Sequence, residues 1–255
     1  MNILSVLRSN MDVSSRRVSF AAAVNAKTGN SGKQVLPVNE IMSGLATPSA
    51  ALLRSLATVP LILGSGSASR RQILNELGLS FSVEKPDIDE RAIRRERPAD
   101  LVLALGLAKA AALCEGERGA ALRAKGALVL TGDQVVVCNG AILEKPEDEA
   151  EARRFIASYG EHPPSTVGSC VVTDAATGRQ WHTVDEASVI FDPIPDATVA
   201  ALLKEGEVFY CAGGLMVEHP LVQPHVRRME GTMDSVMGLS KASVVRLLAE
   251  AVAAR

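Results

Sequence analysis

The residues of this chain best suited to chemistry are concentrated in residues 61–90. A short run of small residues containing Ser65, Ser67 and Ser69 leads into paired arginines, Arg70 and Arg71. Backbone N–H groups at the start of a helix bind anions, and arginines add bidentate charge for phosphate. These residues favour a polyphosphate site, although the same pattern also occurs in an ordinary turn between a strand and a helix.

Carboxylates follow this loop at Asp87, Asp89 and Glu90. Carboxylate oxygens are the ligands that Mg²⁺ takes from proteins, directly or through water. Taken alone, however, such a cluster is more often a solvated acidic turn.

Asp133 interrupts an otherwise apolar run, with Leu128 to Leu130 before it and Val135 to Val137 after it. A carboxylate within a buried strand is costly unless it is paired or bound to metal. Such a residue is a site candidate, either as a metal ligand or as a general base for water. The alternative is a structural carboxylate at the turn made by Gly132.

Two further segments, around Lys145 and around Glu218, carry charged residues that can contact a nucleotide. Lys145, placed before a helix that starts near a proline, can reach a phosphate, although surface lysines are common. Glu218 follows the glycine pair Gly213-Gly214 and can contact a base or a metal, as can Glu230. The motifs of triad hydrolases, dinucleotide-binding folds and P-loops are absent from the sequence.

The surrounding pattern predicts the elements that must position these side chains. An apolar strand over 59–64 leads into the serine loop and a helix over 69–77. A valine-rich run over 127–138 predicts one central strand that carries Asp133, followed by a hairpin turn at Asn139-Gly140. Further strands are predicted over 79–84, 166–174 and 181–191, and helices over 98–114, 146–159, 196–205 and 241–253. This alternation predicts an α/β fold with a mixed central β-sheet flanked by helices.

The composition limits the classes of partner. The chain has 255 residues, a formal net charge of −2 and 3% aromatic residues. Near-neutral charge and scarce aromatics argue against a nucleic-acid binder, and no apolar run has the length of a membrane span. The four cysteines show no CxxC spacing, which argues against a zinc site.

Residues 1–58 differ in composition from the rest, which suggests a disordered N-terminal extension followed by one domain over 59–255. The extension is rich in serine and alanine and poor in acids, as transit peptides are. We expect either a plastid or mitochondrial address or an extension without an address on a cytoplasmic protein.

Four blocks of the sequence, in this order, resemble those of the Maf family of nucleoside triphosphate pyrophosphatases. The first two are Ser65-Gly66-Ser67 with Arg70-Arg71, and Asp87-Ile88-Asp89-Glu90. The third runs from Gly132-Asp133-Gln134 to Lys145-Pro146, and the fourth from Ala212-Gly213 through Glu230-Gly231 to Gly238-Leu239. One block alone is weak evidence, but four in family order are specific.

The resemblance implies the Maf/Ham1-like pyrophosphatase architecture and a homodimer. It also implies hydrolysis of (deoxy)nucleoside triphosphates, including modified ones, to the monophosphate and pyrophosphate with Mg²⁺ or Mn²⁺. Asp133 would be the proton acceptor and, with Glu90, a metal ligand. The implied substrate-binding residues are Ser65, Ser67, Ser69, Arg70, Arg71, Lys109, Gln134, Lys145 and Glu218.

Three positions depart from many bacterial members. Ser69 replaces an arginine, Gln134 a threonine and Glu218 a glutamine, and this set is more similar to the subgroup that acts on 7-methyl-GTP. The block around Glu218 looks more like eukaryotic, plant-type members. The competing hypotheses are a nucleotide-binding regulator of cell division with little catalysis and another phosphoryl enzyme that shares only the loop.

Overall fold

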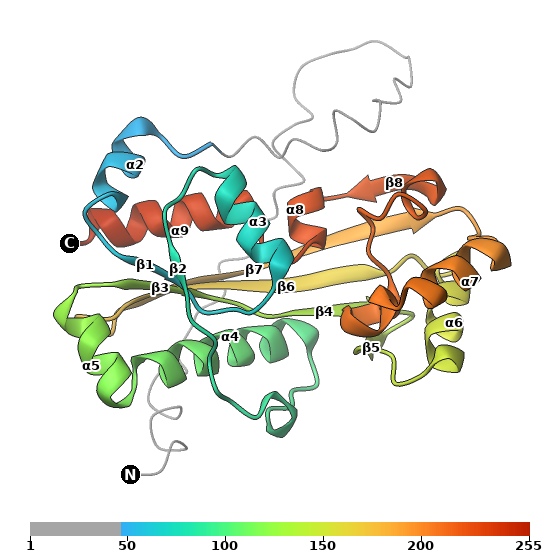
Figure 1. The fold of residues 1–255 in the computed structure, drawn as a ribbon, viewed down its shortest axis with the longest axis horizontal. Coiled ribbons are helices and arrows are strands. Elements are labelled where there is room, and N and C mark those ends of the chain that lie inside the picture. Colours follow the sequence, from blue (N-terminus) through green and yellow to red (C-terminus); the bar gives the residue numbers. More distant parts are fainter. Residues whose placement is uncertain (1–46) are drawn as a thin grey trace. The chain divides into compact units, whose positions relative to one another are not determined.

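The computed structural model describes residues 47–255, so most of the predicted N-terminal extension, including any targeting role, lies outside the described residues. Within the described part the chain forms an eight-stranded mixed sheet (Figure 1). Its main order is β2 (Ser82–Val83), β1 (Leu61–Leu63), β3 (Leu128–Thr131), β6 (Ser165–Asp174), β4 (Gln134–Cys138) and β5 (Ala141–Leu143). From β6 the sheet continues through β7 (Gln180–Phe191) to β8 (Val226–Glu230). Strand β1 is parallel to β2 and β3, and the other pairs are antiparallel, so the predicted mixed α/β sheet is confirmed.

Helices cover both faces of this sheet (Figure 1). Helices α4 (Pro98–Cys114) and α5 (Gly116–Ala124) lie on one face, and α2 (Ala50–Leu56), α3 (Ala68–Glu76) and α9 (Lys241–Ala253) lie on the other. Successive residues of β3 explain this layering, since Leu128 and Leu130 pack with the α3–α9 cluster while Val129 packs with the α4–α5 cluster. A strand buried on both faces reads as a continuous apolar run, which is the pattern seen in the sequence.

Local signals set several boundaries as predicted. Helices α4, α9 and α7 (Asp196–Glu205) have the predicted ends. Pro98 takes the first helical position, where its missing N–H costs nothing, and Gly206 ends α7 with a φ of 84°. The predicted hairpin joins β4 to β5 through Asn139 (φ 48°) and Gly140 (φ 76°), the left-handed pair of a type I′ turn.

The prediction of a single strand over 127–138 is wrong in one respect: the structure divides this segment into two strands, β3 and β4. Both strands pair with the same edge of β6, Thr131 opposite Val171 and Gln134 opposite Gly168. Between them a Cβ on Gly132 would lie 2.1 Å from the carbonyl oxygen of Ser169, so only glycine fits. The break places Asp133 between two buried strands, at the interruption of the ladder.

Other elements are shorter than predicted or were not predicted. The strand predicted over 79–84 is reduced to β2, and the helix predicted over 146–159 is α6 (Glu149–Ser158), which begins after the cap made by Asp148. The sequence did not predict α2, α5, α8 (Met233–Val236) or β8, and for β5 it predicted only the hairpin turn and no bounds. These are mostly short elements, whose periodicity is too brief to detect.

The predicted start of the domain at residue 59 also differs from the structure. Helix α2 begins after Ser49, whose side chain accepts a hydrogen bond from the backbone N–H of Leu52 at 3.1 Å. Leu52 and Leu56 are buried in the cluster that contains α9. The folded unit therefore includes α2, which lies within the basic, acid-poor part of the sequence.

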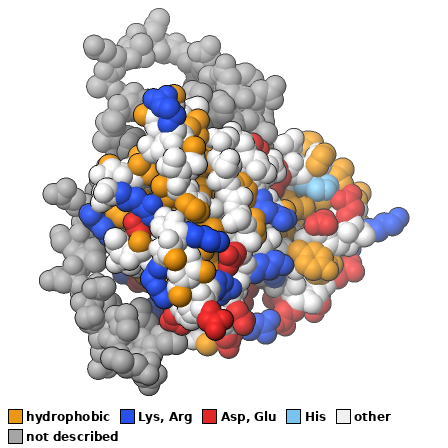
Figure 2. Space-filling model, turned by 60° about the vertical axis from the view of Figure 1, so that its left-hand side comes forward, with side chains coloured by type: hydrophobic (Ala, Val, Ile, Leu, Met, Phe, Trp, Pro, Cys, Tyr) orange, Lys and Arg blue, Asp and Glu red, His pale blue; other side chains and the backbone are white. Residues whose placement is uncertain are grey.

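On the face drawn in Figure 2, basic and acidic side chains are interspersed. Among the helices of residues 47–255, none combines the length and the apolarity that crossing a bilayer requires.

Candidate active site

The serine loop connects β1 to α3 and is organised by its own hydroxyls. Ser67 caps α3, with its Oγ accepting from the backbone N–H of Arg70 at 3.3 Å. The Oγ of Ser65 accepts from the N–H of Ser67 at 3.2 Å, and the hydroxyls of Ser67 and Ser69 lie 2.8 Å apart. The structure therefore brings the three predicted serines together at the N-terminus of α3, the kind of position where N–H groups and hydroxyls can reach an anion.

Arg70 is buried and joins three segments of the chain. Its Nε donates to the carbonyl of Gly238 at 3.0 Å, and its Nη1 donates to Ser65 Oγ at 3.2 Å and to the carbonyl of Gly132 at 3.1 Å. Burial lowers the pKa of the guanidinium, and the nearby carboxylates of Asp133 and Glu90 oppose that shift. Arg70 therefore brings positive charge to the site while it fixes the loops around it. Arg71, the next residue, is exposed on α3.

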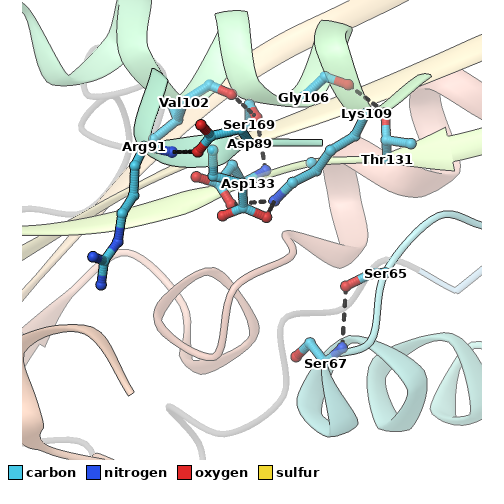
Figure 3. Close-up of polar contacts among 12 residues, drawn as sticks. Ser65, Ser67, Asp89, Arg91, Val102, Gly106, Lys109, Thr131, Asp133 and Ser169 are labelled. Carbon is cyan, nitrogen blue, oxygen red and sulfur yellow. Dashed lines mark hydrogen bonds and ion pairs between the residues drawn. The ribbon is translucent and has the colours of Figure 1, made fainter. Parts of the chain in front are cut away.

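Lys109 brings two predicted site carboxylates together, and Figure 3 shows its contact with one of them, Asp133. Its Nζ lies 2.7 Å from Asp133 Oδ1 and 3.0 Å from Glu90 Oε1. The lysine side chain is only 7% exposed, whereas Glu90 is 54% exposed. A buried ammonium requires paired charges, and here it has two from distant parts of the sequence. Asp89, beside Glu90, has a structural contact instead. Its Oδ1 accepts a hydrogen bond from the backbone N–H of Arg91 and so caps the short 3₁₀ turn Glu90–Ala92.

Ser169, which the sequence analysis did not identify, holds the backbone of Asp133. Its hydroxyl donates to the carbonyl of Val102 in α4 at 2.6 Å and accepts from the N–H of Asp133 at 3.0 Å. Nearby, Thr131 Oγ1 donates to the carbonyl of Gly106 at 2.8 Å. These two hydroxyls fix α4 against the β3–β4 break, and Lys109 projects from α4 toward Asp133 (Figure 3).

The contacts of Ser169 depend on the close approach of α4, which the residues around Ser169 in the sequence do not reveal. A Cβ on Gly106 would lie 2.9 Å from Ser169 Oγ, so the helix can approach only because this residue is glycine. Ser169 lies in a strand that mixes small polar and apolar residues, and it has no motif around it. The one available signal was a hydroxyl in a buried strand, which by itself indicates only a hydrogen-bonded core residue.

Gln134 lies on the side of the site formed by the chain after α8. Its Nε2 donates to the carbonyl of Val236 at 2.6 Å. Gly238 has a φ of 112°, and a Cβ there would lie 2.4 Å from Gln134 Oε1. The predicted block Val236-Met237-Gly238-Leu239 therefore supplies backbone contacts to both Gln134 and Arg70.

Lys145 and Glu218 lie on a second group of segments. The N–H of Gly213 donates to the carbonyl of Glu144 at 3.0 Å, which joins the segment before Lys145 to the glycine pair before Glu218. Burial raises the pKa of the Cys211 thiol to about 11; Glu218 adds to this rise and Lys145 opposes it. Both charges are thus close to Cys211. Within residues 47–255 no hydrogen bond or ion pair connects either side chain to Asp133 or Lys109.

The donor set of the site fits a divalent metal. Asp133 and Glu90 converge on one ammonium, so their oxygens already surround a position that a cation occupies. Mg²⁺ is commonly bound by one or two carboxylates together with substrate phosphates, and two carboxylates are what the structure offers. In the described part of the chain no group of three potential metal ligands occurs, so a metal here requires oxygens from the substrate or water.

These features suit an α/β protein that binds phosphate. They are a serine-lined loop at the start of a helix, a buried arginine and a carboxylate–lysine cluster, all carried by a mixed sheet. The chain belongs to the Maf family, since residues 60–251 match the family described as Maf-like protein. The resemblance inferred from the four sequence blocks is therefore confirmed.

Several curated relatives carry more specific names. A 7-methyl-GTP pyrophosphatase of Dictyostelium discoideum is 39% identical over 193 residues, which is 75% of this chain and 96% of the relative. A 7-methyl-GTP pyrophosphatase of Idiomarina loihiensis is 46% identical over 162 residues, 63% of this chain and 79% of the relative. A dTTP/UTP pyrophosphatase of Vibrio vulnificus is 32% identical over 190 residues, 74% of this chain and 97% of the relative.

Proposed function

We propose that this protein is a nucleoside triphosphate pyrophosphatase, which hydrolyses its substrate to the nucleoside monophosphate and pyrophosphate. The observation that carries the proposal is the position of Asp133, which contacts the buried Lys109 and whose charge also acts on Arg70 of the serine loop. A carboxylate that can activate water thus contacts one cation and lies near a second, and both cations can hold phosphates. The relatives named as pyrophosphatases support the same reaction.

The residues divide the work in a way that suits phosphoryl transfer, where positioning and charge stabilisation matter most. The serine loop, Arg70 and Lys109 hold the triphosphate, and Lys145 and Arg71 add charge at its rim. Asp133 orients a water molecule and accepts its proton as the water attacks phosphorus. The bond between the α-phosphate and the β-phosphate breaks, and pyrophosphate leaves. Mg²⁺ or Mn²⁺, held by Asp133 and Glu90, supplies neutralising charge when bound.

We assign the choice of base to Ser69, Gln134 and Glu218, with 7-methyl-GTP as the preferred substrate. The carboxylate of Glu218 can accept hydrogen bonds from a guanine edge and complement the positive charge of the methylated ring. Two of the relatives named 7-methyl-GTP pyrophosphatase share 39% and 46% identity with this chain, above the 32% of the dTTP/UTP relative, which supports this assignment. A third relative of the same name shares 29%.

A substrate panel tests the proposal. Pyrophosphate release is measured with purified protein and Mg²⁺ or Mn²⁺ for 7-methyl-GTP, GTP, dTTP and UTP. We expect pyrophosphate from all active substrates and the highest kcat/KM with 7-methyl-GTP. Higher kcat/KM with dTTP and UTP would contradict the base assignment. Orthophosphate release would favour a different phosphoryl enzyme, and binding without turnover would favour a nucleotide-binding regulator.

We further propose that the protein clears modified nucleotides as a homodimer, and that its first 58 residues determine where it does so. Light scattering on the purified protein measures the mass of the assembly, and a monomer would contradict the dimer. A fluorescent fusion of residues 1–58 tests targeting. Import into a plastid or mitochondrion is the expected result, whereas diffuse cytosolic fluorescence would show that the segment carries no address.

A further inference from the structure

The ammonium of Lys109 occupies the position between the two carboxylates that we assign to the metal. Its Nζ is 2.7 Å from Asp133 Oδ1 and 3.0 Å from Glu90 Oε1. A cation held at hydrogen-bond distance from both acids leaves no room for a second cation at the same point. Lysine and metal must therefore compete for these oxygens.

Lys109 is also suited to leave this position. Lysine carries a compact charge on a flexible four-carbon chain, which can swing to a new partner. Among the described residues its ammonium is bonded to these two acids and to no backbone group. A triphosphate bound beside the serine loop would offer phosphate oxygens as an alternative partner.

The other buried cation of the site cannot take over this role. Arg70 is fixed by hydrogen bonds to two carbonyls and to a serine hydroxyl, from Gly238, Gly132 and Ser65. Although its charge acts on Asp133 and Glu90, moving it would break contacts that hold three segments together. Lys109 is thus the mobile cation and Arg70 the fixed one.

We propose that Lys109 acts as an internal counter-ion that keeps the metal position occupied until a nucleotide binds. This inference rests on the proposed function and deepens it. Without nucleotide, a divalent cation must displace the ammonium and then tolerate its positive charge nearby, so metal binds weakly. When a triphosphate draws Lys109 away, both carboxylates become available, so nucleotide and metal bind with positive coupling.

Binding of Mn²⁺ in the absence of nucleotide tests this role without any turnover. Free Mn²⁺ is measured by electron paramagnetic resonance during titration of the wild-type protein and Lys109→Met. We expect Lys109→Met to bind Mn²⁺ about tenfold more tightly or more, a typical coupling between interacting sites. Equal Mn²⁺ affinity of the two proteins, or weaker Mn²⁺ binding by Lys109→Met, would overturn the proposal.

Arg91→Met is the matched control, because it removes one positive charge from the residue next to Glu90. The Arg91 side chain points away from Asp133 (Figure 3). We expect its Mn²⁺ affinity to match the wild type; an equal gain in both variants would mean that only long-range charge matters, against the proposal. Thermal melts check folding, and Lys109→Gln replaces the methionine variant if that variant does not fold.

The same titration separates this inference from the proposed reaction. Tighter Mn²⁺ binding by Lys109→Met, together with no pyrophosphate release by the wild type, would retain the counter-ion and reject the reaction. Pyrophosphate release by the wild type, with the same Mn²⁺ affinity in Lys109→Met and the wild type, would support the reaction and reject the counter-ion role of Lys109.

Discussion

The two groups of segments around the proposed site are built in different ways. Around Asp133 the contacts are buried and continuous, with Lys109, Arg70 and Ser169 each bonded to more than one segment. Around Lys145 and Glu218 the chain consists of loops and short 3₁₀ turns, and Lys145 is exposed. The densely bonded group suits the chemistry, which demands fixed geometry, and the looser group suits recognition of a variable base.

The largest expected effect comes from removing the charge of Asp133. Asp133→Asn keeps the size of the side chain, so we expect the protein to fold while kcat falls by about a thousandfold or more, as for loss of a general base. Pyrophosphate release measures kcat, and circular dichroism checks the fold. Asp192→Asn is the control, since this exposed acid pairs with Arg227 far along the chain. Near-normal turnover by a folded Asp133→Asn would show that the densely bonded group of segments does not carry the chemistry.

A smaller effect should follow loss of the Ser169 hydroxyl, which acts on Asp133 through its backbone. Loss of a buried hydrogen-bond partner costs about 1–3 kcal/mol, so we expect Ser169→Ala to lower kcat about tenfold or more with KM nearly unchanged. Ser165→Ala is the control on the same strand, because its hydroxyl bonds Ser188 instead. If both variants lower kcat equally, Ser169 is only part of the core.

Glu218→Gln tests the looser group of segments. We expect the ratio of kcat/KM for 7-methyl-GTP to that for UTP to fall about tenfold, since one charged hydrogen-bond acceptor is lost. Glu207→Gln is the control, as Glu207 is another acid that raises the pKa of Cys211. An unchanged ratio with lower kcat for every substrate would assign Glu218 to the reaction and so contradict the division between the two groups.

The smallest effect concerns two thiols, one beside each group. Burial raises the pKa of Cys170 to about 12 and that of Cys211 to about 11, from an ordinary value of 9.0. Both should stay protonated at pH 8 and react slowly with thiol reagents. Raised thiol pKa values favour the folded state below pH 9, and this contribution is lost as pH rises toward 11 and 12. Mass spectrometry after timed alkylation should show Cys211 reacting before Cys170; rapid labelling of Cys170 at pH 8 would contradict the dense packing around Asp133.

Much of the site could be predicted because its residues occur in short ordered blocks. Ser65, Ser67, Arg70 and Asp133 were predicted from their types and neighbours, and Glu90 from the family resemblance; the structure brings these residues close together. The contacts that these residues make could not be predicted from the sequence. Nothing near Arg70 in the sequence predicts bonds to Gly132 and Gly238, because these partners are 62 and 168 residues away.

The sequence by itself determined the elements whose signals are local. Caps, prolines and apolar spacing place α4, α7 and α9, and Asn139-Gly140 places the hairpin, because each depends on residues a few positions apart. The tertiary structure alone decided the break between β3 and β4, the attachment of α2 and the role of Ser169. Each of these depends on how closely distant backbones approach, which only packing fixes. The meeting of Glu90 and Asp133 on Lys109 follows from the same packing, since three separate segments must converge before one ammonium can contact both acids.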